Sequence, residues 1–211
     1  YKLLELKEIY LEELAKPNNI SASIKQYNEL KEKDYMSISS SSHLLEIIQN
    51  TISKDLTNWI ENEGAYKHIE ELAKKDINTN AEDFIQKTII SQIELSLFKK
   101  GFRSTDFRVK REEQTLDDKR IDITISYGFV GSILIELKLA HNAEAKPTQE
   151  KGKEYLSKLR KYIHGTNSDY GIFLIFNIRS EQEAFDKQMQ ELPKLYKDEK
   201  DIVIMGINCK V

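Results

Sequence analysis

One run of apolar residues constrains the fold of this chain more than any other feature. Residues 170–176 read Tyr-Gly-Ile-Phe-Leu-Ile-Phe, with no charged or amide side chain among them. A strand with one solvated face alternates apolar and polar residues, whereas a continuous apolar run of this length is typical of a strand covered on both faces. The chain is therefore expected to contain a sheet with other elements packed on each side.

The segments around this strand are predicted to alternate between helix and strand. A helix is expected from Thr79 to about Lys100, because Thr79 to Glu82 fits a capping box and Gly101 fits a C-terminal cap. The other predicted elements are strands at 107–115, 120–125 and 132–139, a helix at 149–164, the buried strand, a helix at 181–192 and a strand at 201–209. This order indicates an α/β fold, in which helices flank a mixed β-sheet.

Residues 1–78 are predicted to form a helical N-terminal region that precedes a second domain at 79–211. Apolar stripes with a helical period run through 3–14 and 44–60, and a shorter helix is expected around 65–75. No recognisable chemistry lies in this region. It is expected to pack on the second domain, to link it to further domains of a longer chain, or to form a homo-oligomer contact.

Two of the predicted strands carry charges that a purely structural strand would not need. In the strand at 120–125, alternation places the isoleucines on one face and Asp122 on the other. In the strand at 132–139, it places Glu136 and Lys138 opposite a row of isoleucine and leucine side chains. The short, glycine-containing link between the strands predicts a hairpin. Asp122, Glu136 and Lys138 are therefore expected to point into one volume.

Two carboxylates and an ammonium fit the hydrolysis of a phosphodiester bond. Carboxylate oxygens suit Mg²⁺, which keeps several water ligands for chemistry, and Mn²⁺ can take its place. A lysine would be out of place in a purely structural metal site, but it can orient the attacking water, help to deprotonate it or neutralise charge on a phosphate. The residue types therefore predict a hydrolytic magnesium site with Asp122, Glu136 and Lys138 as catalytic residues.

At Asp122 and Glu136-Leu137-Lys138 the chain resembles the PD-(D/E)xK nuclease superfamily. The predicted order of elements in 79–211 is also similar to the restriction-endonuclease-like fold of that superfamily. The resemblance implies that Asp122, Glu136 and the backbone carbonyl of Leu137 bind the metal, and that Lys138 assists the nucleophilic water.

Three further positions bear on this resemblance. Many members carry a glutamate on the first helix near the metal, and Glu82 is the matching residue here. A frequent Gln-Leu-x-x-Tyr element resembles residues 158–162, with Lys158 in place of the glutamine. Ile121 stands where the superfamily name has proline. The resemblance implies a metal-dependent nuclease acting on DNA, as part of a larger bacterial restriction, repair or anti-phage defence protein.

The tripeptide Glu-Leu-Lys alone is weak support, because it also occurs at 5–7 and 29–31 in predicted helices. For the third copy the structural alternative is a cross-strand ion pair on a solvated sheet face, contributing ~0.2–1 kcal/mol. Two other interpretations stay open. The domain could share the fold but bind nucleic acid or protein without catalysis, or it could be an unrelated α/β domain whose hairpin charges are structural.

Charge is distributed unevenly along the chain, although the net charge is only −3. Basic residues concentrate in 99–111 and 146–161, on either side of the charged hairpin in sequence. Phosphate-binding groups would be needed there if the substrate is a nucleic acid, and the candidates are Lys158, Lys151 and Arg120. The alternative is that these lysines are the solvated faces of surface helices.

Composition excludes several classes of protein. The single cysteine, Cys209, cannot form an intramolecular disulfide, and with four scattered histidines it leaves no zinc-binding cluster. No apolar run approaches the ~20 residues that span a bilayer. A cytoplasmic protein without a membrane partner is the simplest expectation.

Overall fold

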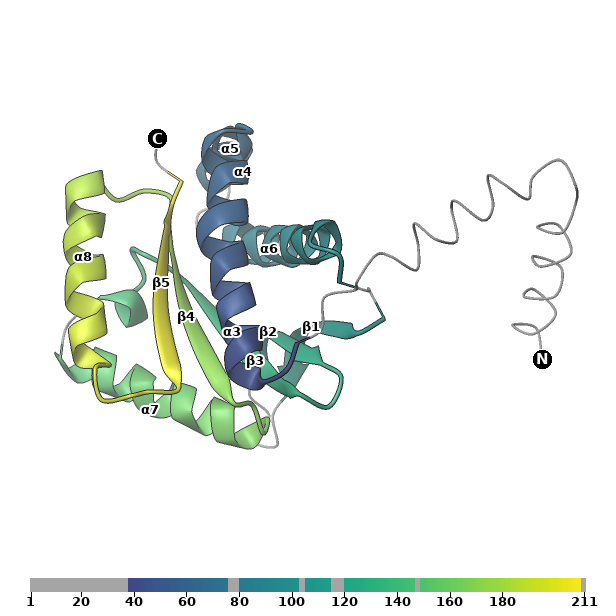
Figure 1. The fold of residues 1–211 in the computed structure, drawn as a ribbon. Helices are drawn as coiled ribbons and strands as arrows, with labels where there is room; N and C mark the ends of the chain where they lie inside the picture. The colour runs from purple at the N-terminus through teal and green to yellow at the C-terminus, as the bar shows by residue number, and fades with distance from the viewer. Residues whose placement is uncertain (1–37, 76–79, 103–104, 115–119, 147–148, 210–211) are drawn as a thin grey trace, which may run out of the picture. The chain divides into compact units, whose positions relative to one another are not determined.

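The computed structural model describes residues 38–211 except 76–79, 103–104, 115–119, 147–148 and 210–211 (Figure 1). The predicted helix at 3–14 and the capping box at Thr79 lie outside the described residues. Contacts divide the chain between Met36 and Ser37, so every described residue belongs to the second of the two units.

Five strands form one mixed sheet in the order in which they occur along the chain. They are β1 (Phe107–Gln114), β2 (Arg120–Tyr127), β3 (Gly131–Leu139), β4 (Tyr170–Asn177) and β5 (Ile202–Asn208). The pairs β1–β2 and β2–β3 are antiparallel, and the pairs β3–β4 and β4–β5 are parallel. Antiparallel neighbours can be joined by short links, whereas parallel neighbours need a crossover, which α7 (Gln149–Gly165) and α8 (Gln182–Leu195) provide.

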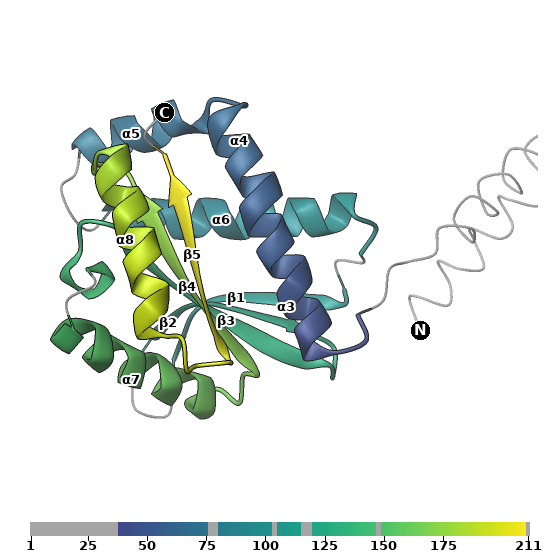
Figure 2. The ribbon, with the colours of Figure 1, turned by 60° about the vertical axis from the view of Figure 1, so that its left-hand side comes forward.

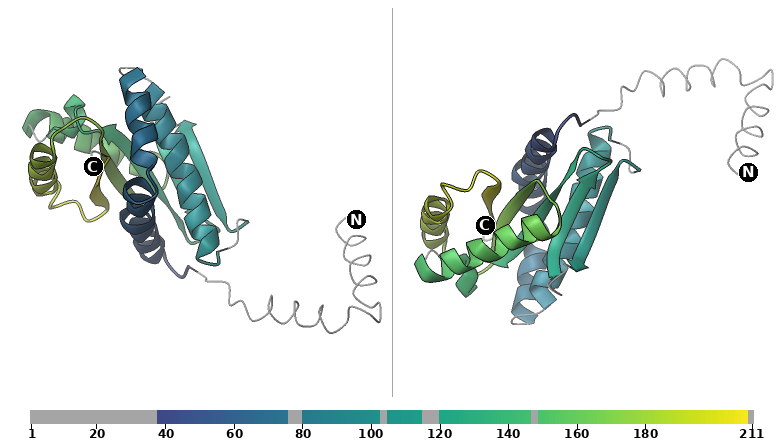
Figure 3. Two further views of the ribbon diagram at one scale, coloured as in Figure 1. Left: turned by 90° about the horizontal axis from the view of Figure 1, so that it is seen from above. Right: turned by 90° about the horizontal axis from the view of Figure 1, so that it is seen from below.

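Helices cover both faces of the sheet, as predicted. One face carries α7 and α8, and the other carries α3 (Ser41–Asn50), η1 (Thr51–Leu56), α4 (Thr57–Glu61), α5 (Ala65–Lys75) and α6 (Asn80–Lys99). Figures 2 and 3 show these two helical layers on opposite sides of the strands. The α/β class and the mixed sheet flanked by helices are confirmed. Within the described residues, no helix is long and apolar enough to cross a membrane.

The central strand β4 is buried on both sides. Its residues Ile172, Leu174 and Phe176 pack among α3 to α6, while Phe173 and Ile175 pack against α7 and α8. All five side chains are at most 1% exposed. The apolar run thus joins two hydrophobic clusters, one on each face of the sheet.

The predicted helix at 44–60 contains a π-helical turn at its centre, η1. Its buried residues are spaced by four positions, at Leu44, Ile48, Ile52, Leu56 and Ile60, and each is at most 1% exposed. In a regular α-helix, a spacing of four residues drifts by about 40° at each step, because each residue turns by ~100°. The wider π turn offsets this drift and keeps the stripe on the sheet.

Two helix ends show how local sequence acts. Ser40, in a run of serines at 39–42, caps α3 by accepting a hydrogen bond from the His43 backbone N–H at 3.1 Å. Helix α8 continues two residues past Pro193, although it was predicted to end near this residue. The last turn closes with a bond from the Tyr196 N–H to the Pro193 carbonyl.

Candidate active site

The predicted site lies where β2 separates from β3. The two strands pair from Tyr127 opposite Gly131 as far as Ile123 opposite Ile135. One residue beyond this point, the Asp122 carboxylate takes the place of a backbone partner, because its Oδ2 accepts the Leu137 N–H at 2.7 Å.

The separation of the strands also changes the surroundings of Ile121. Alternation predicts this residue on the same face as Ile123 and Ile125, but it packs in the cluster with α7 and α8, whereas the other two pack among α3 to α6. Beyond Ile123, the pairing of β2 follows β1 alone, and Ile121 lies opposite Glu113. Ile121 therefore changes its packing partners just beyond the last residue of β2 that pairs with β3.

Lys138 lies beside the same two groups. Its Nζ is 3.9 Å from Asp122 Oδ2 and donates a hydrogen bond to the Leu137 carbonyl at 2.9 Å. The side chains of Asp122 and Lys138 are each 16% exposed. The Lys138 ammonium therefore lies beside the Asp122 carboxylate and the Leu137 carbonyl, two groups that the resemblance assigns to the metal.

Glu136 is the most deeply buried member of the group, with 2% of its surface exposed. Its Oε2 accepts a hydrogen bond from the Tyr155 hydroxyl at 3.0 Å. Its Oε1 is buried and has no hydrogen-bond partner in the part of the chain that the structure describes. Burial, and then the neighbouring Asp122, raise the pKa of Glu136 from 4.5 to about 7, although Lys138, Tyr155 and Lys158 act in the opposite direction.

These residues have the chemistry to hold a divalent cation. Two carboxylates and a backbone carbonyl supply hard oxygen ligands, and the unpartnered Glu136 oxygen is a buried acceptor that a cation would satisfy. Among the described residues, no three His, Cys, Asp or Glu side chains are placed to hold a metal together. The candidate side-chain ligands at this site are therefore the two carboxylates of Asp122 and Glu136. The predicted third carboxylate, Glu82, is on α6, but its side chain lies outside what the structure describes.

Helix α7 contributes a residue that the sequence did not single out for the site. Tyr155 and Tyr162 lie on the inward face of α7, and both are buried, at 4% and 3% exposure. The hydroxyl of Tyr155 nevertheless reaches Glu136, and burial raises the Tyr155 pKa well above its usual value. The sequence signal for this contact is a tyrosine at an inward position of α7, the helix that follows the strand with Glu136 and Lys138.

The predicted nucleic-acid ligands Lys158 and Lys151 line one pocket beside the site. The pocket has a volume of about 260 Å³, and its lining is Ala143, Glu144, Lys151, Glu154, Tyr155 and Lys158. Lys158 Nζ lies 5.3 Å from the ring centre of Tyr155 and 5.4 Å from that of Tyr162. The third candidate, Arg120, begins β2, but its side chain lies outside the described residues.

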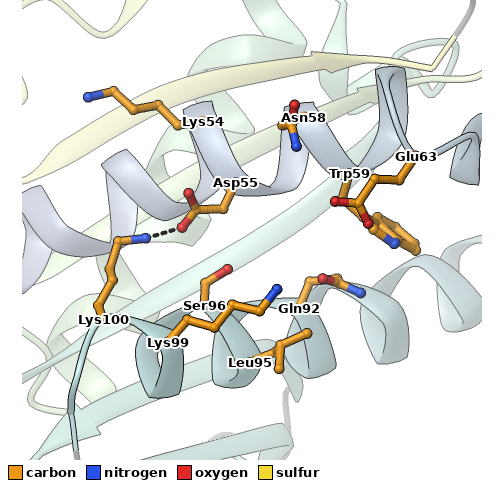
Figure 4. A pocket seen from close by; sticks show the side chains of 10 residues that line it. All are labelled: Lys54, Asp55, Asn58, Trp59, Glu63, Gln92, Leu95, Ser96, Lys99 and Lys100. Atoms are coloured by element: carbon orange, nitrogen blue, oxygen red, sulfur yellow. Dashed lines mark hydrogen bonds and ion pairs between the residues drawn. The ribbon is translucent and has the colours of Figure 1, made fainter.

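A larger pocket, of about 510 Å³, lies away from this chemistry. It is a groove between η1–α4 and α6, with Asp55 paired to Lys100 across it and Trp59 in its wall (Figure 4). These helices pack on the face of the sheet opposite α7. The groove contains none of the predicted site residues, so its size does not make it the candidate active site.

The loop after β3 is tied to α8. The buried Gln188 amide donates to the carbonyls of Ala140 and Ala145, on either side of the short helix η2 (Ala143–Ala145). These bonds hold the loop between β3 and α7. His141 lies in this loop and lines a separate pocket of about 330 Å³ with Lys146 and Lys187.

Comparison with known protein families shows a match over most of the chain. The model of a family described as a domain of unknown function, DUF8371, matches residues 44–180. No curated protein and no solved structure matches the chain. The matched residues run from α3 through β4 and include the hairpin and Tyr155.

Proposed function

We propose that this chain, which belongs to the DUF8371 family, is a magnesium-dependent nuclease that hydrolyses phosphodiester bonds in DNA. One observation carries the proposal: the Glu136 carboxylate is buried beside Asp122 with one oxygen unpartnered in the described structure, and Lys138 and the Leu137 carbonyl lie next to it.

A purely structural role for these charges accounts for the observation less well. An ion pair on a solvated face would leave both partners in contact with water, but Glu136 is 2% exposed. Lys138 supplies one positive charge, whereas Asp122 and Glu136 can supply two negative charges. Burying a carboxylate beside another is unfavourable unless a cation or a proton compensates. Lys138 leaves one of the two negative charges uncompensated. A divalent cation would compensate it and would satisfy the Glu136 oxygen that has no partner among the described residues.

The residues divide the proposed reaction among them. Asp122, Glu136 and the Leu137 carbonyl hold Mg²⁺, or Mn²⁺ in its place, and Glu82 is a further candidate ligand. A divalent cation held there would supply Lewis-acid chemistry, by lowering the pKa of water and polarising the phosphate. Lys138 would orient the nucleophilic water and help to remove its proton. Lys151 and Lys158, with Arg120 as a third candidate, bind the flanking phosphates of the DNA strand.

The arrangement of the elements supports the same proposal. A helix, an antiparallel three-stranded meander, a crossover helix and a parallel strand follow one another, with the charged residues on β2 and β3. This order is similar to the restriction-endonuclease-like fold. We propose on this likeness that the domain acts in the cytoplasm, within a larger bacterial restriction or anti-phage defence protein that can assemble as a homo-oligomer.

The direct test is cleavage by the purified protein. Plasmid DNA, linear DNA and RNA are incubated with Mg²⁺, Mn²⁺ or EDTA, and products are followed by electrophoresis. Cleavage of DNA is expected with either metal and not with EDTA. Glu136→Gln, Asp122→Asn and Lys138→Met should each lower the rate by about 10²–10⁴-fold. Glu94→Gln changes an exposed glutamate on α6 and serves as the matched control.

Two outcomes separate the alternatives. Full activity in the Glu136 and Lys138 variants would refute the assigned site. Metal-independent DNA binding without cleavage, across all metals and substrates, would instead support a binding module that has the fold but lacks the catalysis.

A further inference from the structure

The hydrogen bond between Tyr155 and Glu136 joins two buried groups on different elements. The tyrosine is on α7 and is 4% exposed, and the glutamate is on β3 and is 2% exposed. The hydroxyl donates to Oε2 at 3.0 Å, whereas Oε1 has no partner in the described part of the chain. The bond therefore distinguishes the two oxygens of one carboxylate.

The tyrosine ring that carries this hydroxyl is itself held in place. Phe173 of β4 packs against it, with ring centres 4.9 Å apart and planes at 33°. Lys158 Nζ lies 5.3 Å from the centre of the ring. Contacts of both kinds are favourable and directional. The position of the hydroxyl is thus set by packing before any ligand binds.

We propose that Tyr155 is a positioning residue, which holds Oε2 of Glu136 so that Oε1 is presented to the divalent cation. The inference rests on the proposed function, because it concerns the metal site of that reaction. A glutamate side chain has several rotatable bonds, and ordering them for a ligand costs conformational entropy. Because the Tyr155 hydroxyl and its packed ring already order the Glu136 side chain in the folded protein, less entropy is lost when the carboxylate binds a metal.

Residues that orient metal ligands have a measurable effect of known size. Removing such a hydrogen bond lowers metal affinity or activity by about 10–100-fold in characterised metal sites. Tyr155→Phe keeps the ring, and with it the contacts to Phe173 and Lys158, but deletes the hydroxyl. The variant should bind Mg²⁺ or Mn²⁺ about 10–100-fold more weakly than the wild-type protein.

Tyr196→Phe is the matched control. Tyr196 is 3% exposed and packs in the same cluster, with its ring centre 6.1 Å from that of Phe173. Its hydroxyl is buried, and no described residue is its hydrogen-bond partner. Deleting this hydroxyl should leave metal affinity unchanged, which separates an effect on the site from a general effect of losing a buried oxygen.

The experiment is calorimetric titration of the full chain with MnCl₂ and with MgCl₂, with circular dichroism to check the fold of each variant. Weaker binding in Tyr155→Phe, with wild-type binding in Tyr196→Phe, is the expected result. Cleavage by Tyr155→Phe should also recover at high metal concentration while its KM for DNA stays near the wild-type value. A role in stability alone would lower the melting temperature without changing metal affinity, and that result would overturn the proposal.

Failure of this inference and failure of the proposed function give different results. If the wild-type protein binds neither metal, the proposed function fails. If it binds metal and Glu136→Gln does not, but Tyr155→Phe binds as the wild type does, only the positioning role fails.

If Tyr155→Phe does not fold, Phe173→Leu provides the test. It keeps the hydroxyl but loosens the ring, and unchanged metal affinity there would overturn the proposal.

Discussion

Neutralising Glu136 should stabilise the metal-free protein, and the gain should grow with pH. The folded protein raises the pKa of this carboxyl from 4.5 to about 7, chiefly through burial. Glu136→Gln keeps the shape of the side chain and can still accept a hydrogen bond from Tyr155, but it carries no charge at any pH. The substitution therefore removes the cost of ionising a buried group.

The direction of this stability change follows from the number of protons bound by the folded and the unfolded chain. Between pH 4.5 and about 7, the folded protein holds a proton on Glu136 that the unfolded chain has released. The contribution of this group to stability is therefore complete below pH 4.5 and is lost as the pH rises through about 7. Raising the pKa from 4.5 to about 7 corresponds to about 3 kcal/mol. Glu136→Gln should raise the free energy of unfolding by about 1 kcal/mol at pH 5 and by about 3 kcal/mol at pH 8.

Urea unfolding in EDTA, followed by circular dichroism at both pH values, measures this difference. Glu94→Gln, at an exposed position, should change stability by less than about 0.5 kcal/mol at either pH. An equal effect of Glu136→Gln at pH 5 and pH 8 would refute the reasoning, because it would show that the charge of Glu136 carries no cost in the folded state. In saturating Mg²⁺ the wild-type protein should be more stable than Glu136→Gln, since only the wild-type protein gains stability from binding the ion.

Two further predictions concern the first residue of β3 and the pocket beside α7. Gly131→Ala should lower the free energy of unfolding by about 1–3 kcal/mol, because its φ is +154° and a Cβ would overlap the Asp169 carboxylate and lie 2.9 Å from the Ser41 Cβ. Gly165→Ala, where a Cβ would meet nothing within 4 Å, should change it little in the same urea titration. Lys158→Gln should weaken DNA binding and reduce the slope of log K against log salt by about 1 in fluorescence anisotropy. The exposed Lys161 on the same helix is the control, and an equal effect of Lys161→Gln would contradict a specific role for Lys158.

Much of the secondary structure follows from local patterns. The apolar run at 170–176 predicted a strand buried on both faces, and β4 is such a strand. Alternation in 132–139 separated Glu136 and Lys138 from the apolar row, and β3 bears this out in the proximity of the two charges to Asp122. These predictions succeed because side-chain direction in a strand depends only on backbone geometry and neighbouring strands.

Other features depend on how elements pack. The apolar stripe in residues 44–60 is compatible with an ordinary α-helix. The π turn at Thr51–Leu56 keeps all residues of this stripe on the side that faces the sheet. Ile121 packs with α7 and α8, just beyond the last residue of β2 that pairs with β3. The spacing of four residues is a sequence signal for the π turn, whereas no local pattern marks the change at Ile121.

For this protein, the sequence by itself determined the elements, their order, the two-sided burial of β4 and the same-facing charges of the hairpin, because all of these follow from the periodicity of the chain. Only the tertiary structure decided which groups meet. It brought the Asp122 carboxylate to the Leu137 N–H, placed the Tyr155 hydroxyl on one oxygen of Glu136 and left the other unpartnered among the described residues. Such contacts depend on the separation of two strands and on the rotation of a helix over the sheet, and neither is encoded in a local pattern.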